Sequence, residues 1–151
     1  MQPQENKVRA LIHSSCLTLD QGEYAQYMKL FADPMRYRVV TYSPELRKEM
    51  TWLDHDTDEM KHLFKMLPQH VTLPGTFFRH AVVCETHQVE DGWRAVTSLM
   101  LTYTDLDGGS RLMAVGRYHD VIKEHDGDLR ITEREVRLET RDLGPGLQVP
   151  L

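Results

Sequence analysis

The sequence has few of the features that assign a function class directly. Only two of its 151 residues are cysteines, Cys16 and Cys84, and they form no CxxC pair, which argues against a disulfide framework or a cysteine-rich metal site. Because both have apolar neighbours, we expect two buried free thiols. No stretch approaches the roughly 18 apolar residues of a membrane-spanning helix, and the N-terminus lacks the basic start of a signal peptide. We therefore expect a cytoplasmic protein without a membrane segment.

An excess of basic charge is also missing. The 18 basic and 23 acidic residues give a net charge of −5, so the chain has no electrostatic footprint for nucleic acid. The glycine-rich phosphate-binding motifs GxGxxG and GxxxxGK(S/T) are absent, and no glycine elbow surrounds the serine pair Ser14-Ser15. Nucleic-acid binding, nucleotide binding and serine-nucleophile catalysis are therefore not expected.

The acidic segment at residues 54–59 is the strongest candidate for a metal site, but it does not match a known pattern. A calcium loop needs glycine at its sixth position and glutamate at its twelfth, where this sequence has Glu59 and Lys65. Glu59 and His62 form a single Glu-x-x-His step, whereas di-iron bundles need two such steps and further glutamates on four helices. We expect no metal site here and interpret the segment as a solvated helix start.

Length and composition are those of one globular domain. Hydrophobic residues make up 40% of the chain and charged residues 27%, and no linker, repeat or low-complexity segment divides it. We therefore expect a single domain over residues 1–151.

Helical periodicity dominates the beginning of the chain. Apolar residues spaced i, i+3, i+4, i+7 predict a first helix over residues 8–19 and a second over residues 24–31. We expect Asp20 and Glu23 to form a capping box for the second helix, and the Asp33-Pro34 step to end it, because the residue before a proline is disfavoured in helical geometry.

A strand and a third helix follow. Alternation over residues 35–42 predicts the strand, and residues 50–53 form a second extended piece. Asp56 and Glu59 predict another capping box, at the start of a helix that we expect to end at Pro68.

The second half of the sequence has the character of a β-sheet. Glycine-containing turns at residues 90–92, 107–109 and 126–127 separate long extended segments, and short turns favour antiparallel neighbours. Glycine and proline in residues 144–150 predict an irregular tail. The helices can bury their apolar stripes only against one face of such a sheet, so we expect an α+β half-cone. The four predicted strands are residues 77–89, 93–103, 110–123 and 128–141.

Arginine and glutamate alternate along the last of these strands. Arg130, Arg134 and Arg137 interleave with Glu133 and Glu135. Opposite charges across strands usually form a solvated face, although arginine-rich surfaces also suit protein interfaces.

His80, which follows Phe78 and Arg79, has two open interpretations. It is either a histidine at the edge of the core that hydrogen-bonds to the backbone, or an acid/base group in a pocket or an anchor at an interface.

Three segments of the second half together resemble the small (β) subunit of ring-hydroxylating oxygenases. They are Phe-Arg-His-Ala-Val-Val at residues 78–83, Gly-Arg-Tyr-His-Asp at residues 116–120 and Leu-Arg-Ile-Thr-Glu-Arg-Glu-Val-Arg-Leu-Glu-Thr at residues 129–140. In the first half, a short helix leads to Tyr37-Arg38-Val39, which is similar to the family's Tyr-x-Val strand. The resemblance spans residues 8–143, with Glu139 where the family commonly has aspartate.

The resemblance implies a cystatin-like or NTF2-like (nuclear-transport-factor-2-like) half-cone, with N-terminal helices packed on a strongly curved, mainly antiparallel sheet. It implies a large α subunit as partner, which carries the Rieske [2Fe–2S] cluster and the mononuclear iron. The β chains, without a cofactor of their own, would form a homotrimer within a mixed hexamer and support assembly in aromatic-compound degradation. On this interpretation six residues have interface or structural roles: Arg79, His80, Arg117, Tyr118, Asp120 and Arg134.

The same fold also houses stand-alone enzymes, among them ketosteroid isomerase, scytalone dehydratase and polyketide cyclases of the SnoaL type. An isomerase or dehydratase with a pocket inside the cone is therefore the alternative, and a non-catalytic binding module is a third. A β subunit should expose an unusually large apolar patch, whereas an enzyme should hold a titratable group of perturbed pKa in a pocket. The alternative pocket residues are Tyr24, Asp33, His80 and Tyr118.

Overall fold

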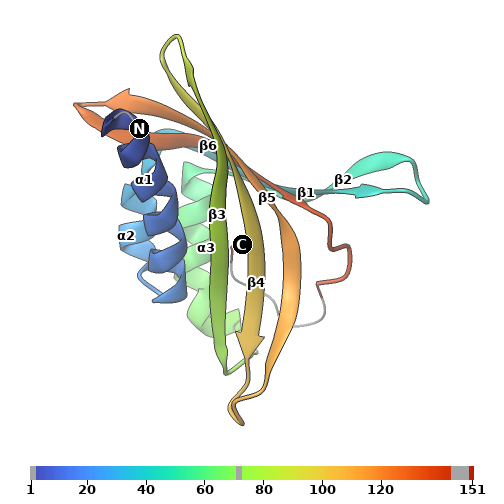
Figure 1. Ribbon diagram of the computed structural model, residues 1–151. Coiled ribbons are helices and arrows are strands. Elements are labelled where there is room, and N and C mark those ends of the chain that lie inside the picture. The colour runs from blue at the N-terminus through green and yellow to red at the C-terminus, as the bar shows by residue number, and fades with distance from the viewer. Residues whose placement is uncertain (1–2, 71–72, 144–149) are drawn as a thin grey trace.

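The computed structural model describes residues 3–70, 73–143 and 150–151 (Figure 1), and only the backbone of residues 69 and 70. The predicted irregular tail, residues 144–150, lies outside the described residues except for Pro150. The described residues form three helices and six strands. These are α1 (Pro3–Asp20), α2 (Tyr24–Lys29), β1 (Phe31–Ser43), β2 (Lys48–Asp56), α3 (Thr57–His70), β3 (Thr76–Val89), β4 (Gly92–Thr104), β5 (Ser110–His125) and β6 (Asp128–Leu138).

The strands form one sheet in the order β2-β1-β6-β5-β4-β3. All neighbours are antiparallel except β1 and β6, which run parallel. The meander from β3 to β6 is thus confirmed, and its last turn uses Asp126 and Gly127 at φ values of 51° and 84°, a geometry that glycine favours. The sheet is curved and the helices lie on one side of it (Figure 1), which confirms the α+β half-cone. None of the described helices is long and apolar enough to span a membrane.

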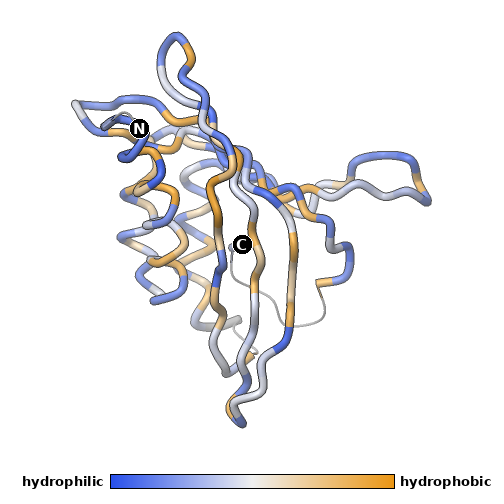
Figure 2. Tube along the Cα trace, viewed as in Figure 1, coloured by the Kyte–Doolittle hydropathy of each residue, from blue (hydrophilic) through white to orange (hydrophobic). Residues whose placement is uncertain are grey.

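The core lies between the helices and the inner face of the sheet, which we define as the face toward the helices. Apolar residues recur along α1 and along the central strands (Figure 2), where side chains point inward at every second position. On β4 the buried residues are Trp93, Ala95, Thr97, Leu99, Leu101 and Tyr103. On α1 they are Val8, Leu11, Ile12, Ser15, Cys16 and Leu19.

Irregularities in the strand register help to bend the sheet. The pairing shifts between Val83 and Glu85 on β3, and further shifts occur on β4 and β5. Cys84 is exposed at an outward-facing position of β3, in phase with Phe78, His80 and Val82, while Cys16 is buried, and both thiols are free. The expectation of a buried thiol is therefore confirmed for Cys16 and wrong for Cys84.

The helix ends differ in two places from the expectations. α2 ends at Lys29, and the Asp33-Pro34 step lies inside β1 with a cis peptide bond. α3 continues through Pro68 to His70. Pro68 lies in the last turn, where the missing N–H removes only one hydrogen bond before the helix ends.

One of the two predicted capping boxes forms. The Glu59 N–H donates to Asp56 Oδ1 at 2.9 Å and the Asp56 N–H donates to Glu59 Oε1 at 3.2 Å, which confirms the box at the start of α3. At α2 the N-cap residue Glu23 makes no side-chain capping bond. The predicted box with Asp20 is wrong because the Asp20 carboxylate accepts hydrogen bonds from Arg79 on β3 instead.

Candidate functional site

A bidentate ion pair lies inside the cone. Asp120 on β5 and Arg134 on β6 are direct cross-strand partners. Arg134 Nε donates to Asp120 Oδ1 at 2.8 Å and Nη2 donates to Oδ2 at 3.0 Å, and both side chains are 0% exposed. The remaining guanidinium nitrogen, Nη1, donates to Ser15 Oγ on α1 at 2.8 Å. The predicted solvated face is therefore wrong for Arg134, which points into the core because β6 places it there with Ile131 and Val136.

Arg134 remains charged in this environment. Burial alone would lower the pKa of its guanidinium, but the facing Asp120 carboxylate raises that pKa well above its ordinary value. The guanidinium carbon also lies 3.9 Å from the centroid of the Tyr118 ring, a cation–π contact that is stronger away from water. The pair joins α1 to the two central strands and has the features of a structural element.

Two neighbouring groups stay neutral near pH 7. Burial raises the pKa of the Cys16 thiol and raises that of the Tyr118 hydroxyl well above 10. The two groups contact each other, with Cys16 Sγ 3.9 Å from the Tyr118 oxygen. A thiol acts as a nucleophile in its thiolate form, and burial disfavours this form at Cys16.

A second buried ion pair lies beside the first strand of the meander. Arg79 Nη1 on β3 donates to Asp20 Oδ1 on α1 at 2.8 Å, and the Arg79 backbone N–H reaches the same carboxylate. Arg79 Nη2 donates to the carbonyl oxygen of Pro150. The Tyr37 hydroxyl contacts the backbone of Leu151, whose side chain belongs to the core.

An apolar area occupies the outer face of the meander. In the strand register, Phe78 faces Thr102 beside Leu112, and His80 faces Met100 beside Val115. Phe78 is 55% exposed and Val82 65%, although both lie on a long strand that is paired with β4. Isolated apolar residues are normal on a surface, whereas a contiguous group marks an interaction site. We call this group the outer patch: Phe78, Val82, Met100, Leu112 and Val115.

A second apolar surface lies on the hairpin of β1 and β2, which projects from the body of the molecule (Figure 1). Four large side chains on it are exposed: Tyr42, Leu46, Met50 and Trp52. The projection leaves these residues outside the core that the helices cover.

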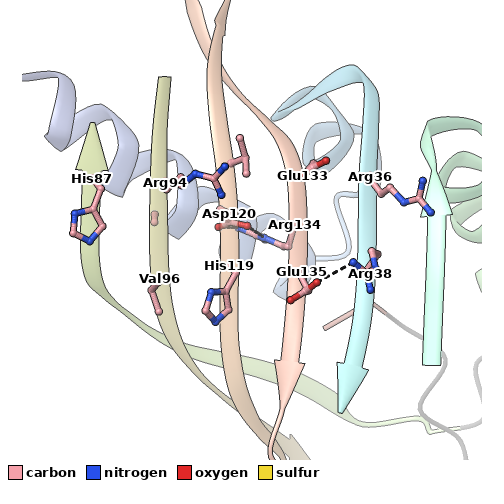
Figure 3. A pocket seen from close by; sticks show the side chains of 12 residues that line it. Arg36, Arg38, His87, Arg94, Val96, His119, Asp120, Glu133, Arg134 and Glu135 are labelled. Carbon is pink, nitrogen blue, oxygen red and sulfur yellow. Dashed lines mark hydrogen bonds and ion pairs between the residues drawn. The ribbon is translucent and has the colours of Figure 1, made fainter. Parts of the chain in front are cut away.

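Charged side chains gather on another part of the outer face. A groove of about 660 Å³ crosses β3, β4, β5, β6 and β1 (Figure 3). In its centre His119 faces Glu135, and Arg38 Nη1 lies 3.0 Å from Glu135 Oε2. Arg36 pairs with Asp54 on β2 through two hydrogen bonds of 2.7 Å. Among the described residues no group of three or more His, Cys, Asp and Glu side chains is arranged to hold a metal ion.

Comparison with known proteins decides the family. A SnoaL-like domain model matches residues 3–135. The chain is 30% identical over 154 residues to the β subunit of the methanesulfonate monooxygenase hydroxylase of Methylosulfonomonas methylovora, covering 95% of this chain and 85% of the relative. It is 26% identical over 145 residues to the β subunit of 2-aminobenzenesulfonate 2,3-dioxygenase of Alcaligenes sp, covering 95% and 97%. The chain belongs to the SnoaL-like β subunits of ring-hydroxylating oxygenases.

Solved structures support the fold of this β-subunit family. A Novosphingobium aromaticivorans protein assigned as the β subunit of an aromatic-ring-hydroxylating dioxygenase aligns with a TM-score of 0.83 at 18% identity, covering 97% of this chain and 95% of that one. A protein of the same organism assigned as a scytalone dehydratase aligns with a TM-score of 0.66 at 14% identity, covering 91% and 85%. At these identities the likeness concerns the fold alone.

The structure separates the six residues expected to have interface or structural roles into two groups. Arg79, Tyr118, Asp120 and Arg134 are buried, and their contacts lie within the chain. His80 and Arg117 are exposed on the outer face. Thr102 Oγ1 lies 3.1 Å from His80 Nε2, and the Phe78 ring centroid lies 5.0 Å from that of His80, so the ring belongs to the surface around the outer patch.

The four alternative pocket residues do not converge. Tyr24 stacks on Phe64 with ring centroids 4.8 Å apart, and it lines, with Asp33, a cavity of about 550 Å³ between α2, β1 and α3. Tyr118 is buried on the inner face of the sheet, and His80 is exposed on the outer face. This constellation therefore cannot act together on one substrate.

Sequence reasoning missed several of the residues that matter. Ser15 and Tyr37 hold buried polar groups through contacts distant in sequence, for which a single sequence carries no local signal. The outer patch did leave a signal. Met100 and Val115 are apolar at outward positions between residues of the core face, so the alternation marks them as exposed.

Proposed function

We propose that this chain is the non-catalytic β subunit of a Rieske-type ring-hydroxylating oxygenase and supports assembly of the catalytic α subunits. The outer patch carries the proposal, because an exposed apolar group on long, well-paired strands is suited to burial by another subunit. The exposed apolar side chains of the β1–β2 hairpin supply a second surface of the same kind.

The interior also supports a structural role, because its buried polar groups are paired with each other or held in their neutral form. The buried charges of Arg134 and Asp120 satisfy each other, and burial keeps Cys16 and Tyr118 neutral. A general acid or base works best with a pKa near the operating pH. The interior cluster is thus better suited to holding α1 on the sheet than to proton transfer.

The proposed assembly is a homotrimer of β subunits within a mixed hexamer of α and β chains. The Rieske cluster and the mononuclear iron are assigned to the α subunit, and no cofactor is assigned to this chain. The proposed compartment is the cytoplasm, since Cys16 and Cys84 are both free thiols, as is usual in a reducing compartment.

Co-expression with a large-subunit candidate encoded beside this chain tests the proposal. Native mass spectrometry of the purified complex should give a mixed oligomer, and metal analysis of the separated subunits should find iron only with the large one. Oxygen uptake, measured with an added electron donor, should require both subunits, with an alkanesulfonate and an aminobenzenesulfonate in the substrate panel because the two relatives are named for such substrates.

A chain that purifies as a monomer or dimer and does not bind the large subunit would overturn the proposal. The isolated chain would then be assayed for isomerase and dehydratase activity, with the cavity beside Tyr24 and Asp33 as the first place to mutate.

A further inference from the structure

The last two residues of the chain are held inside the cone by groups from opposite parts of the sheet. Arg79 on β3 donates from Nη2 to the carbonyl oxygen of Pro150. Tyr37 on β1 uses its hydroxyl twice, accepting from the Leu151 N–H at 2.9 Å and donating to the Leu151 carbonyl oxygen at 3.2 Å.

The groups that make these contacts are themselves deeply buried. The side chain of Arg79 is 1% exposed and Tyr37 is 0% exposed, while Leu151 is 3% exposed and packs in the main core cluster. A buried guanidinium nitrogen or hydroxyl without a partner is costly, so both groups need the backbone that residues 150–151 supply. The Asp20 carboxylate fixes the Arg79 guanidinium in place from α1.

These contacts together define a recognition pattern. The Arg79 guanidinium donates to the carbonyl oxygen of the proline, and the Tyr37 hydroxyl hydrogen-bonds to the N–H and C=O of the residue that follows it. The core accommodates the branched aliphatic side chain of that second residue. We propose that the interior between β1 and β3 is a peptide-binding site for a Pro-Leu segment, which the chain fills with its own residues 150–151. The filled site closes the cone and completes the packing of α1 against β3.

The proposal predicts that the site can be emptied and refilled. Cys16 gives the readout, because its buried thiol belongs to the same core cluster as Leu151, whereas Cys84 is exposed. The full chain and a variant lacking residues 150–151 are labelled with a thiol reagent under native conditions, and the label at each cysteine is quantified by mass spectrometry. Cys84 serves as the internal control.

Deletion of residues 150–151 should speed labelling of Cys16 by at least about tenfold, since removal of the segment opens the core locally, while Cys84 labelling stays constant. Acetyl-Pro-Leu added in excess should slow Cys16 labelling again, and acetyl-Pro-Asp, which places a charge in the apolar subsite, should not. Unchanged Cys16 labelling in the shortened chain, or equal effects of the two peptides, would overturn the proposal.

A full-length variant covers the case in which the shortened chain does not fold. Tyr37→Phe keeps the aromatic ring and removes only the hydroxyl that holds Leu151, and Tyr42→Phe makes the same change at an exposed position of β1. Hydrogen exchange at the Leu151 amide should be at least about tenfold faster in Tyr37→Phe and unchanged in Tyr42→Phe. Equal protection of that amide in both variants would show that Tyr37 does not hold the segment.

Discussion

Arg134 and Arg137 lie three positions apart on β6, and their side chains face opposite sides of the sheet. Arg134 faces the helices, is fully buried and is matched by Asp120 and Ser15. Arg137 faces outward, is half-exposed and pairs with Glu49 and Glu135 at the surface. One side-chain type thus serves two purposes, and the direction of the strand pleat decides which.

The two faces of the meander differ from each other in the opposite sense to the usual one of a charged surface over an apolar core. Its inner face contains charged groups in an otherwise apolar core, while its outer face exposes Phe78, Val82 and Met100. Buried charges require partners inside the chain, and exposed apolar residues are suited to partners outside it. We therefore expect the inner face to determine the stability of this subunit and the outer face to determine its association.

The largest change in the free energy of unfolding is expected from the buried ion pair of Asp120 and Arg134. Asp120→Ala leaves the Arg134 guanidinium buried without its counter-charge, and we expect a loss of about 3–5 kcal/mol in the free energy of unfolding. Urea denaturation of the variant and the parent measures it. The double variant Asp120→Leu, Arg134→Met should recover most of this loss, because it removes both charges together. A cost below about 1 kcal/mol for Asp120→Ala would contradict a structural role for the pair.

The outer patch should affect association without affecting the fold. Val82→Asp places a charge where another subunit is expected, and we predict at least a tenfold, or about 1.4 kcal/mol, loss of subunit affinity. Its free energy of unfolding should change by no more than about 0.5 kcal/mol, as for other exposed sites. Native mass spectrometry and thermal melting separate the two effects. Leu106→Asp, at an exposed residue of the β4–β5 turn, is the matched control, and equal assembly of both variants would exclude the patch as an interface.

Alkaline pH should act mainly through buried tyrosines on the inner side. Burial raises the pKa of Tyr27 to about 12, so the unfolded chain, with an ordinary value near 10, loses its proton first. Stability from this group is complete below pH 10 and is lost as the pH rises toward about 12. The melting temperature of Tyr27→Phe should fall less steeply between pH 9 and 12 than that of the parent. Tyr42→Phe, which makes the same change at an exposed residue, is the control and should fall as steeply as the parent. A fall of the same slope in Tyr27→Phe and the parent would show that another group is responsible.

The smallest change in the free energy of unfolding is expected from Arg137 on the outer face. Arg137→Ala removes surface ion pairs to Glu49 and Glu135, and such pairs contribute about 0–1 kcal/mol because water and salt screen them. The difference from the parent in urea denaturation should shrink further at high salt. A loss as large as that of Asp120→Ala would erase the distinction between the two faces.

Local patterns in the sequence predicted the elements whose contacts are local. The Asp56–Glu59 box depends only on residues three apart, and the meander depends on short turns such as that at Gly127, so both could be predicted. The failures have a common cause. Asp20 has the same local pattern as Asp56, but Arg79, 59 residues away, takes its carboxylate.

The candidate site was harder to predict than the fold. Arg134 stands in a run of alternating charge that is typical of a solvated face, and only its pairing with Asp120 and Ser15 makes an inward position favourable. Cys84 has apolar neighbours, yet it shares the outward-facing phase of β3 with Phe78 and Val82 and is exposed. The burial of Arg134 depends on contacts that exist only in the folded chain, whereas the exposure of Cys84 follows the alternation along its strand.

The parallel pairing of β1 with β6 has a consequence for the order of folding. Thr41 on β1 and Leu138 on β6 are joined by a hydrogen bond across 97 residues of chain, whereas the strands of the meander are joined by short turns. Closing so long a loop costs entropy before its contacts form. We therefore expect the meander to assemble first as three successive hairpins, and β1, together with β2, to dock on β6 in the slow step that completes the sheet.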